Sequence, residues 1–247
     1  MSLPIQRILT KLDDYLSKND YVGAEKHLLY WVQEAKDGEP DVLSLHNELI
    51  GLYRKTGKKQ QALEQVDIAL NMVEQYGKEQ MIDGATTYVN SATAYKAFGM
   101  AELSIPLFEK ARIIYEKNLP STDPRIAGLY NNTALALVDL KEFDQAKKLY
   151  EKAIDILNDA PRGALEQAIS YLNLATMNEV QYGLSQGEEY INECLEKASM
   201  LLDKHKDDTD GYYAFVCEKC ATVFGYYGWV IYEKQLIKRY TAIYERD

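Results

Sequence analysis

Apolar positions recur along this chain with the three- and four-residue spacing of amphipathic helices. In "YNNTALALVDLKEFDQAKKLYEKAIDIL", Tyr130 to Leu157, two such runs are separated by a short polar turn near Lys141 and Glu142. Side chains at positions i, i+4 and i+7 share one face of a helix, so each run predicts a helix that buries one stripe. We find no alternating period-2 run bounded by turns, and the pattern predicts an all-α protein.

The same pattern returns at a nearly fixed interval. A related stretch, "YVNSATAYKAFGMAELSIPLFEKARIIY", begins 42 residues earlier at Tyr88. In each second helix a small residue is followed by a large one four positions later, and often by another small one three positions after that. The opening small residues are Ala24, Ala62, Ser104 and Ala146, at intervals of 38, 42 and 42, and the large ones are Leu28, Val66, Phe108 and Tyr150. A fixed period predicts a repeat architecture in which stacking buries each hairpin's apolar stripe.

Turn-forming segments divide the chain into about six helical hairpins. We expect one α-α superhelix (solenoid) domain over residues 1–247, with units of roughly 1–39, 40–81, 82–122, 123–161, 162–208 and 209–247. The last two units are less regular. Ile191 and Leu195 take the opening and large positions of the fifth unit, and the interval of 45 from Ala146 predicts an insertion in "QYGLSQGEE". In the sixth unit Gly228 and Tyr232 take these positions.

Composition and charge disfavour several classes of partner and cellular location. The 247 residues carry a formal net charge of −10, and an acidic chain repels phosphate backbones, which disfavours nucleic acid as a partner. No secretion signal and no apolar stretch of about 18 residues occurs, so we expect no membrane span. Three cysteines form no disulfide framework, and together these features predict a cytoplasmic protein with reduced thiols.

The recurring residues resemble those of the tetratricopeptide repeat (TPR) family. Its pattern has an aromatic, a Leu-Gly pair and a Tyr in the first helix, then A-x3-F-x2-A in the second. The members in the fourth unit are Tyr130, Thr133, Ala134, Leu137, Ala146, Tyr150 and Ala153, of which Thr133 and Leu137 are substitutions. The family period is about 34 residues, and the period of about 42 here is similar to repeats of kinesin light chains and of bacterial peptide-sensing regulators. "STDPRIAGLYNNTALAL", Ser121 to Leu137, is particularly similar to that variety.

The resemblance implies that the first helix of each hairpin lines a concave groove that binds peptides, often through asparagines. Asparagines stand two residues after the shared tyrosine position in three units, and the preceding position holds an asparagine in two units. The first set is Asn90, Asn132 and Asn173, and the second is Asn47 and Asn131. A carboxamide both donates and accepts hydrogen bonds, so such a ladder could hold an extended backbone. The alternative is that these asparagines bond neighbouring turns or helices.

Charged residues at one first-helix position suggest the character of a partner. Arg54 and Lys96 stand eight residues after the shared tyrosine position in units two and three, where Val138 and Glu179 stand later. This arrangement favours a partner segment of acidic character against units two and three. The alternative is ordinary solvated charge at helix ends.

The cysteines and most of the tyrosines are expected to be packing residues. Cys217 and Cys220 form a C-x-x-C pair with no second pair to complete a zinc site, so we expect buried thiols and no metal. Tyrosine is abundant, with 20 residues, and suits both partly wet helix interfaces and grooves. The C-terminal cluster of Tyr212, Tyr213, Tyr226 and Tyr227 is a candidate self-association surface.

We find no nucleophile with a base and an oxyanion donor, and no phosphate loop or cofactor motif, so we expect neither catalysis nor a cofactor. The sequence therefore predicts a protein–protein or protein–peptide interaction module that acts as an adaptor or scaffold. Two alternatives remain open: a signal-responsive regulator whose superhelix changes curvature on binding a short peptide, and a structural homo-oligomer.

Overall fold

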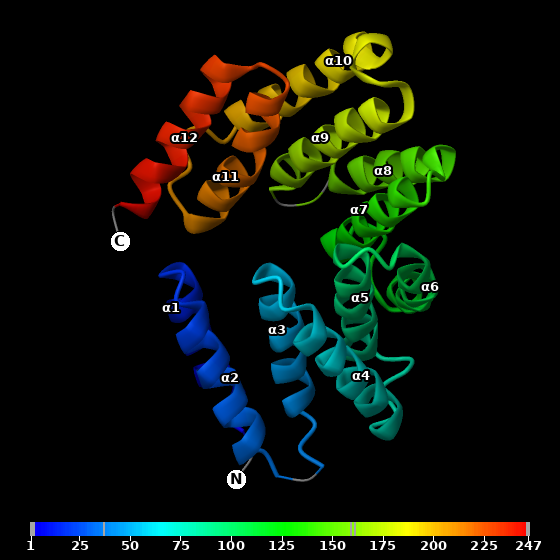
Figure 1. Cartoon of the computed structure of the whole chain (residues 1–247), viewed down its shortest axis with the longest axis vertical. Coiled ribbons are helices and arrows are strands. Elements are labelled where there is room, and N and C mark those ends of the chain that lie inside the picture. Colours follow the sequence, from blue (N-terminus) through cyan, green and yellow to red (C-terminus); the bar gives the residue numbers. More distant parts are fainter. Residues whose placement is uncertain (1–2, 37, 159, 161, 246–247) are drawn as a thin grey trace. The chain divides into compact units, whose positions relative to one another are not determined.

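The computed structural model describes residues 3–36, 38–158, 160 and 162–245. These residues form twelve α-helices and no strand, which Figure 1 follows in chain order from blue to red. The predicted all-α helical-repeat fold is confirmed, and consecutive helices pair into six hairpins. We call the first helix of each hairpin its A helix and the second its B helix.

The chain forms two compact units of three hairpins each. In residues 1–118 the A helices are α1 (Ile5–Ser17), α3 (Val42–Lys55) and α5 (Ile82–Ala97), and the B helices are α2 (Tyr21–Glu34), α4 (Lys59–Gln75) and α6 (Ala101–Asn118). In residues 119–247 the A helices are α7 (Pro124–Asp139), α9 (Gly163–Tyr182) and α11 (Gly211–Tyr226), and the B helices are α8 (Phe143–Leu157), α10 (Leu184–Asp203) and α12 (Val230–Tyr244). A single domain over the whole chain stays a prediction.

Each hairpin turn contains one residue in the left-handed backbone region. Glycine takes this place in four of the six turns, because it adopts positive φ without a steric penalty. Asn19 and Lys141, with φ of 54° and 63°, take it in the other two. The six residues are Asn19, Gly57, Gly99, Lys141, Gly183 and Gly228. All six residues have a positive φ, and each lies in the short turn between the two helices of its hairpin.

Helix starts follow the local sequence. The Asp123 carboxylate accepts a hydrogen bond from the Arg125 backbone N–H at 2.9 Å, and Pro124 supplies the fixed φ of the first turn of α7. Asp210 accepts from the backbone N–H groups of Tyr212 and Tyr213 at the start of α11. These caps satisfy donors that a helix leaves unpaired.

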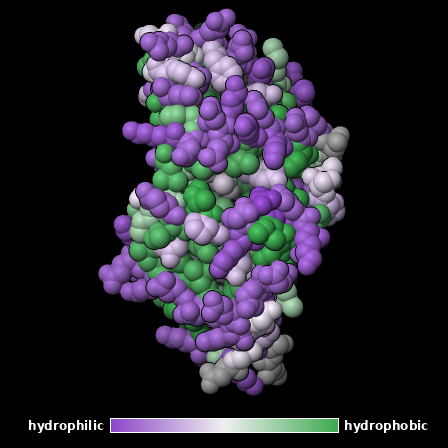
Figure 2. All heavy atoms as spheres, turned by 90° about the vertical axis from the view of Figure 1, so that its right-hand side faces the viewer, coloured by the Kyte–Doolittle hydropathy of each residue, from purple (hydrophilic) through white to green (hydrophobic). Residues whose placement is uncertain are grey.

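The repeating stripe of the B helices forms the core of each hairpin stack. Ala24, Ala62 and Ala146 have no exposed surface, and the large residues Phe108 and Tyr150 are buried on α6 and α8. Burying one such large side chain stabilises the fold by about 1.5–3 kcal/mol. The polar remainder faces outward, and Figure 2 shows hydrophilic side chains over much of the face that it displays.

The structure corrects the register of the last two hairpins. The turn between α9 and α10 carries no insertion, because the single residue Gly183 joins the two helices. The fourth residue of α10 is the buried Gly187, followed by buried Ile191 and Cys194, so the small–large–small stripe begins one turn earlier than the sequence pattern suggested. Gly228 likewise lies in the turn before α12 and not on its buried face.

Candidate binding surface on the A helices

Two of the predicted asparagines join neighbouring A helices in residues 1–118. Asn47 on α3 donates from Nδ2 to Thr87 Oγ1 on α5 at 2.9 Å, and Thr87 donates in turn to the carbonyl of Asp83 at 3.0 Å. Asn90 on α5 donates from Nδ2 to Asn47 Oδ1 at 3.1 Å. The alternative interpretation, that asparagines bond adjacent helices, therefore describes Asn47 and Asn90 in this structure.

The same arrangement recurs in residues 119–247. Asn131 on α7 donates from Nδ2 to Ser170 Oγ on α9 at 2.8 Å, and Ser170 donates to the carbonyl of Glu166 at 3.0 Å. Asn131 is buried, and its Oδ1 accepts no hydrogen bond from any residue that the structure describes. Asn47 and Asn131 thus occupy equivalent positions and make the same helix-joining contact.

Asn132 and Asn173 differ from the other three. Both are half-buried, on α7 and α9, and neither side chain has a hydrogen-bond partner within the described ranges of the chain. They occupy the same register on two neighbouring A helices, two residues after Tyr130 and Tyr171. Their carboxamides retain their donors and acceptors for another molecule.

The predicted basic positions lie near the ends of A helices. Arg54 is exposed in the last turn of α3, and Lys96 is half-buried in the last turn of α5. On α9 the equivalent position is Glu179, whose side chain is half-buried. The charge at this register therefore changes sign between these A helices.

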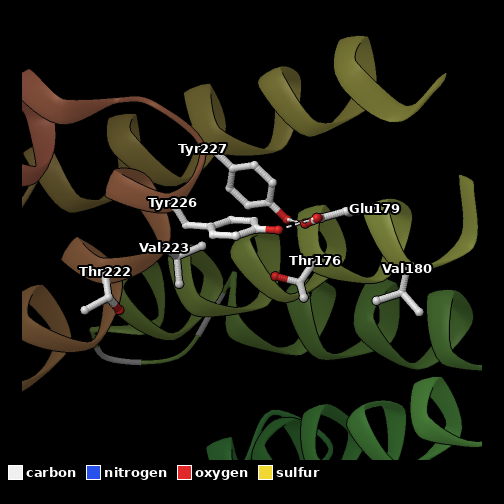
Figure 3. A pocket seen from close by; sticks show the side chains of 7 residues that line it. All are labelled: Thr176, Glu179, Val180, Thr222, Val223, Tyr226 and Tyr227. Carbon is white, nitrogen blue, oxygen red and sulfur yellow. Dashed lines mark hydrogen bonds between the residues drawn. The ribbon is translucent and has the colours of Figure 1, made fainter. Parts of the chain in front are cut away.

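A hollow of about 460 Å³ lies between the A helices α9 and α11. Its lining residues are Thr176, Glu179, Val180, Thr222, Val223, Tyr226 and Tyr227 (Figure 3). The hydroxyl of Tyr226 donates to Glu179 Oε1 at 2.5 Å, and that of Tyr227 donates to Glu179 Oε2 at 2.7 Å. Figure 3 shows both hydroxyls directed at the one carboxylate, which is thereby fixed at the hollow.

The Glu179 carboxylate changes the acidity of both tyrosines. Its hydrogen bond raises the pKa of Tyr226, and burial together with the same carboxylate raises the pKa of Tyr227. The two rings meet edge to face, with centroids 5.0 Å apart. Both phenols therefore stay protonated and act as donors at neutral pH.

A second tyrosine–glutamate contact joins the opposite ends of the same two helices. Tyr212 at the start of α11 donates to Glu166 Oε1 on α9. The Arg162 guanidinium lies 5.1 Å from the centre of the Tyr212 ring and pairs with Asp210 at 2.9 Å. The helices α9 and α11 are thus held together near both ends, with a stretch of surface between.

Exposed apolar side chains lie on this stretch and at its Glu179 end, and the sequence pattern did not identify them. The exposed fractions are 49% for Phe215, 55% for Val180 and 65% for Tyr226. One exposed face of α11 carries Tyr212, Phe215, Thr222 and Tyr226. Tyr213, by contrast, is buried. A second apolar stripe on α11, offset from the core stripe, is the sequence signal that could have identified this face.

The cysteines are packing residues. Cys194, Cys217 and Cys220 are buried free thiols, so the predicted burial of Cys217 and Cys220 is confirmed. Burial raises the pKa of Cys194 to about 11. Within the described parts of the chain, no group of three or more His, Cys, Asp or Glu is placed to hold a metal ion. Among the same residues, no helix is both long enough and apolar enough to cross a membrane.

Comparison with known proteins supports the family resemblance. Residues 83–159 match the family model described as tetratricopeptide repeat, and no curated protein sequence matches the chain. BtubC (BKLC) from P. vanneervenii is similar in structure, with a TM-score of 0.68 and 20% identity over 84% of this chain and 83% of that one. A putative kinesin light chain of nearly identical TPR-like repeats from Podosopora anserina gives 0.58 and 19%, over 83% and 96%.

A Rap protein complexed with competence and sporulation factor is also similar, with a TM-score of 0.55 and 12% identity over 96% of this chain and 73% of that one. At these identities the likenesses show the fold alone. Residues 83–159 contain most of the hairpins α5–α6 and α7–α8, and the helical pairing continues on both sides of them. Residues 83–159 are therefore tetratricopeptide repeats, and they lie within an all-α helical-repeat fold.

Proposed function

We propose that the A helices of residues 119–247 bind an extended segment of a partner protein or peptide, and that the chain acts as a non-catalytic adaptor or scaffold. The observation that carries this proposal is the state of Asn132 and Asn173. They stand at the same register of two adjacent A helices, are partly exposed, and have no partner in the described part of the chain.

Their spacing suits a peptide backbone. Packed helices lie about 8–10 Å apart, and an extended chain advances about 3.3–3.6 Å per residue. The two carboxamides are therefore spaced to bond backbone groups about two to three residues apart. Because a carboxamide donates and accepts, each can hold a peptide group without reading the side chain next to it.

Hydrogen bonds alone do not give the affinity of a stable complex. Each contributes about 0.5–1.5 kcal/mol net, whereas a micromolar complex needs about 8 kcal/mol. The exposed side chains of Phe215, Val180 and Tyr226 supply apolar area on the neighbouring helix pair. Covering apolar surface contributes about 25 cal/mol per Å², so these side chains are the proposed anchors.

The other residues predicted to contact a partner have different roles in this proposal. Asn47, Asn90 and Asn131 hold the A helices in position through their hydrogen bonds, and support the surface from within the fold. Contact of Arg54 and Lys96 with an acidic partner stays a prediction. So do a change of curvature on binding, homo-oligomer formation, and a cytoplasmic location.

A binding experiment tests the proposal. Peptides are selected from a displayed random library against the full chain, and the enriched peptides are synthesised and titrated by calorimetry. We expect Asn132→Ala and Asn173→Ala each to weaken binding by roughly two- to tenfold, the range of one lost hydrogen bond. Asn71→Ala, an exposed position on the B helix α4, is the control and leaves affinity unchanged. Unchanged affinity in both test variants would contradict the proposal.

A further inference from the structure

The Glu179 carboxylate is an anion fixed in a hollow without a cation beside it. Tyr226 and Tyr227 each donate to one of its oxygens, so its position is determined by two contacts from the end of α11. No lysine, arginine or histidine of the described residues lies within ion-pair distance of it. An ionised carboxylate has about four acceptor sites, and the two phenols use only two.

The walls of the hollow suit the stem of a long side chain. Val180 and Val223 present methyl groups, and the ring of Tyr226 is largely exposed beside the carboxylate. Long basic side chains place their methylene stems on apolar surface and keep the charged head near a polar group. An aromatic ring adds attraction for a cation that passes over its face. The volume of about 460 Å³ gives room for one such side chain.

Charge favours the same occupant. The chain carries a formal net charge of −10, which attracts a basic segment. At the register of Glu179 the neighbouring A helix α7 has the uncharged Val138, and α3 and α5 have the basic Arg54 and Lys96. An acidic group at this register is thus particular to α9 among these four helices.

We propose that this hollow binds the arginine or lysine side chain of the bound segment, with its cationic head on Glu179 and its stem against Val180, Val223 and the Tyr226 ring. This inference rests on the proposed function, because the basic residue belongs to the segment that Asn132 and Asn173 hold. Asn173 and Glu179 are six residues apart on α9, about 9 Å along the helix axis and about 120° around it. Val180, which lines the hollow, lies on the same face as Asn173, so one segment extends from Asn173 into the hollow.

Small probes test the hollow without a full partner. Nα-acetyl-arginine methylamide, and its citrulline and glutamate counterparts, are titrated into the isotope-labelled full chain and followed by NMR. We expect saturable shifts at Val180, Val223 and Tyr226 with the arginine compound, and none at the same concentrations with the other two. Citrulline keeps the shape of the side chain and removes its charge, so equal shifts with citrulline would overturn the inference, as would no shifts with the arginine compound.

The variant Glu179→Gln tests the carboxylate itself. It keeps the side-chain length and a hydrogen-bonding oxygen for one tyrosine, and we expect binding of the arginine compound to weaken about tenfold, the loss of one charge-assisted hydrogen bond. Glu166→Gln is the matched control, since Glu166 accepts from Tyr212 at the other end of the same helix pair and does not line the hollow. Equal weakening in both variants would contradict a specific role of Glu179.

The selected peptides separate this inference from the proposed function. If those peptides require Asn132 and Asn173 but contain no basic residue and bind Glu179→Gln normally, the inference fails and the proposed function stands. If the arginine compound binds at Glu179 while no peptide depends on the two asparagines, the hollow is a cation-binding site and the proposed segment contact fails. Preference for peptides with an aliphatic or aromatic residue in the hollow would likewise overturn the assignment of a basic side chain.

Discussion

Asn131 on α7 donates a hydrogen bond to Ser170 on α9 at 2.8 Å, and thereby repeats the contact of Asn47 with Thr87. Asn131 is buried, and its Oδ1 is already without a partner in the described structure. A buried donor that loses its acceptor costs about 1–3 kcal/mol. The pair therefore makes the A-helix packing of residues 119–247 sensitive to one hydroxyl group.

The variant Ser170→Ala removes that acceptor and leaves the Asn131 amide unpaired in the interior. We expect the free energy of unfolding to fall by about 1–3 kcal/mol, measured by urea denaturation followed by circular dichroism. Asn132→Ala, next to Asn131 but half-buried and without a partner among the described residues, is the control, and we expect a change within about 0.5 kcal/mol. An equally large decrease in the free energy of unfolding of Asn132→Ala would show that the Asn131–Ser170 hydrogen bond is not a specific source of stability.

Lys141 occupies the left-handed turn position between α7 and α8 with φ of 63°. This conformation costs a residue with a Cβ atom about 1–2 kcal/mol, and glycine avoids the cost. Part of the gain is lost because glycine is more flexible in the unfolded chain. We therefore expect Lys141→Gly to raise the free energy of unfolding by up to about 1 kcal/mol.

The reverse change at the equivalent turn provides the control for Lys141. Gly99 has φ of 75° between α5 and α6, and we expect Gly99→Ala to lower the free energy of unfolding by about 1 kcal/mol. Thermal and urea unfolding of both variants measure these changes. Effects of the same sign at the two turns would contradict the role of the left-handed conformation.

Tyr150 is fully buried on α8, and its hydroxyl has no hydrogen-bond partner in the described residues. Burial raises the pKa of this phenol far above its usual value, so the group stays neutral. Because an unpaired buried hydroxyl costs about 1–3 kcal/mol, we expect Tyr150→Phe to be neutral or stabilising in a urea titration. Tyr150→Ala leaves a cavity in the core and should cost about 3–5 kcal/mol. A clear loss of stability in Tyr150→Phe would mean that the hydroxyl is hydrogen-bonded in solution.

His46 on α3 links the stability of the fold to pH. Burial lowers the pKa of its imidazole below the usual value of about 6.5, although the hydrogen bond to Gln65 at 2.6 Å partly opposes this. The folded state therefore binds a proton less readily than the unfolded state. Its contribution to stability is complete above the unfolded pKa and is lost as pH falls below about 6.5 towards the folded pKa.

We expect the free energy of unfolding to decrease by up to about 1.4 kcal/mol per pH unit in that range for the wild-type chain, relative to His46→Gln. Other titrating groups, such as the carboxyl of Glu48, are present in both proteins and cancel in the difference. Urea unfolding at several pH values between about 5 and 8, the range in which histidine titrates, measures this difference. Parallel curves for the two proteins would exclude His46 as the source.

The helices and their pairing follow from local patterns. The spacing of Ala62, Val66 and Ala69 predicts a buried stripe on α4, and all three residues have no exposed surface. The small–large–small pattern gave the wrong register where its residues were less typical. Around Ile191 the opening small residue is a glycine, Gly187, which is also common in turns, so the register was assigned one helical turn too late.

The sequence predicted only part of the proposed binding surface. Five asparagines share two repeat positions, but position cannot distinguish a side chain that bonds the next helix from one that bonds nothing in the fold. That distinction depends on what stands opposite. Asn47 faces Thr87 and Asn131 faces Ser170, whereas Asn132 and Asn173 face no partner in the described structure.

By itself, the sequence determined the all-α class, the six hairpins and the buried faces, because these depend on periodicity within a helix and on small and large residues at fixed offsets. Only the tertiary structure decided which polar groups are satisfied and which are open. Glu179 receives hydroxyl groups from residues 47 and 48 positions later in the chain, and Asn131 reaches one 39 positions later. Such contacts depend on how α9 packs against α7 and α11, and the pattern of residues within one helix does not determine that packing.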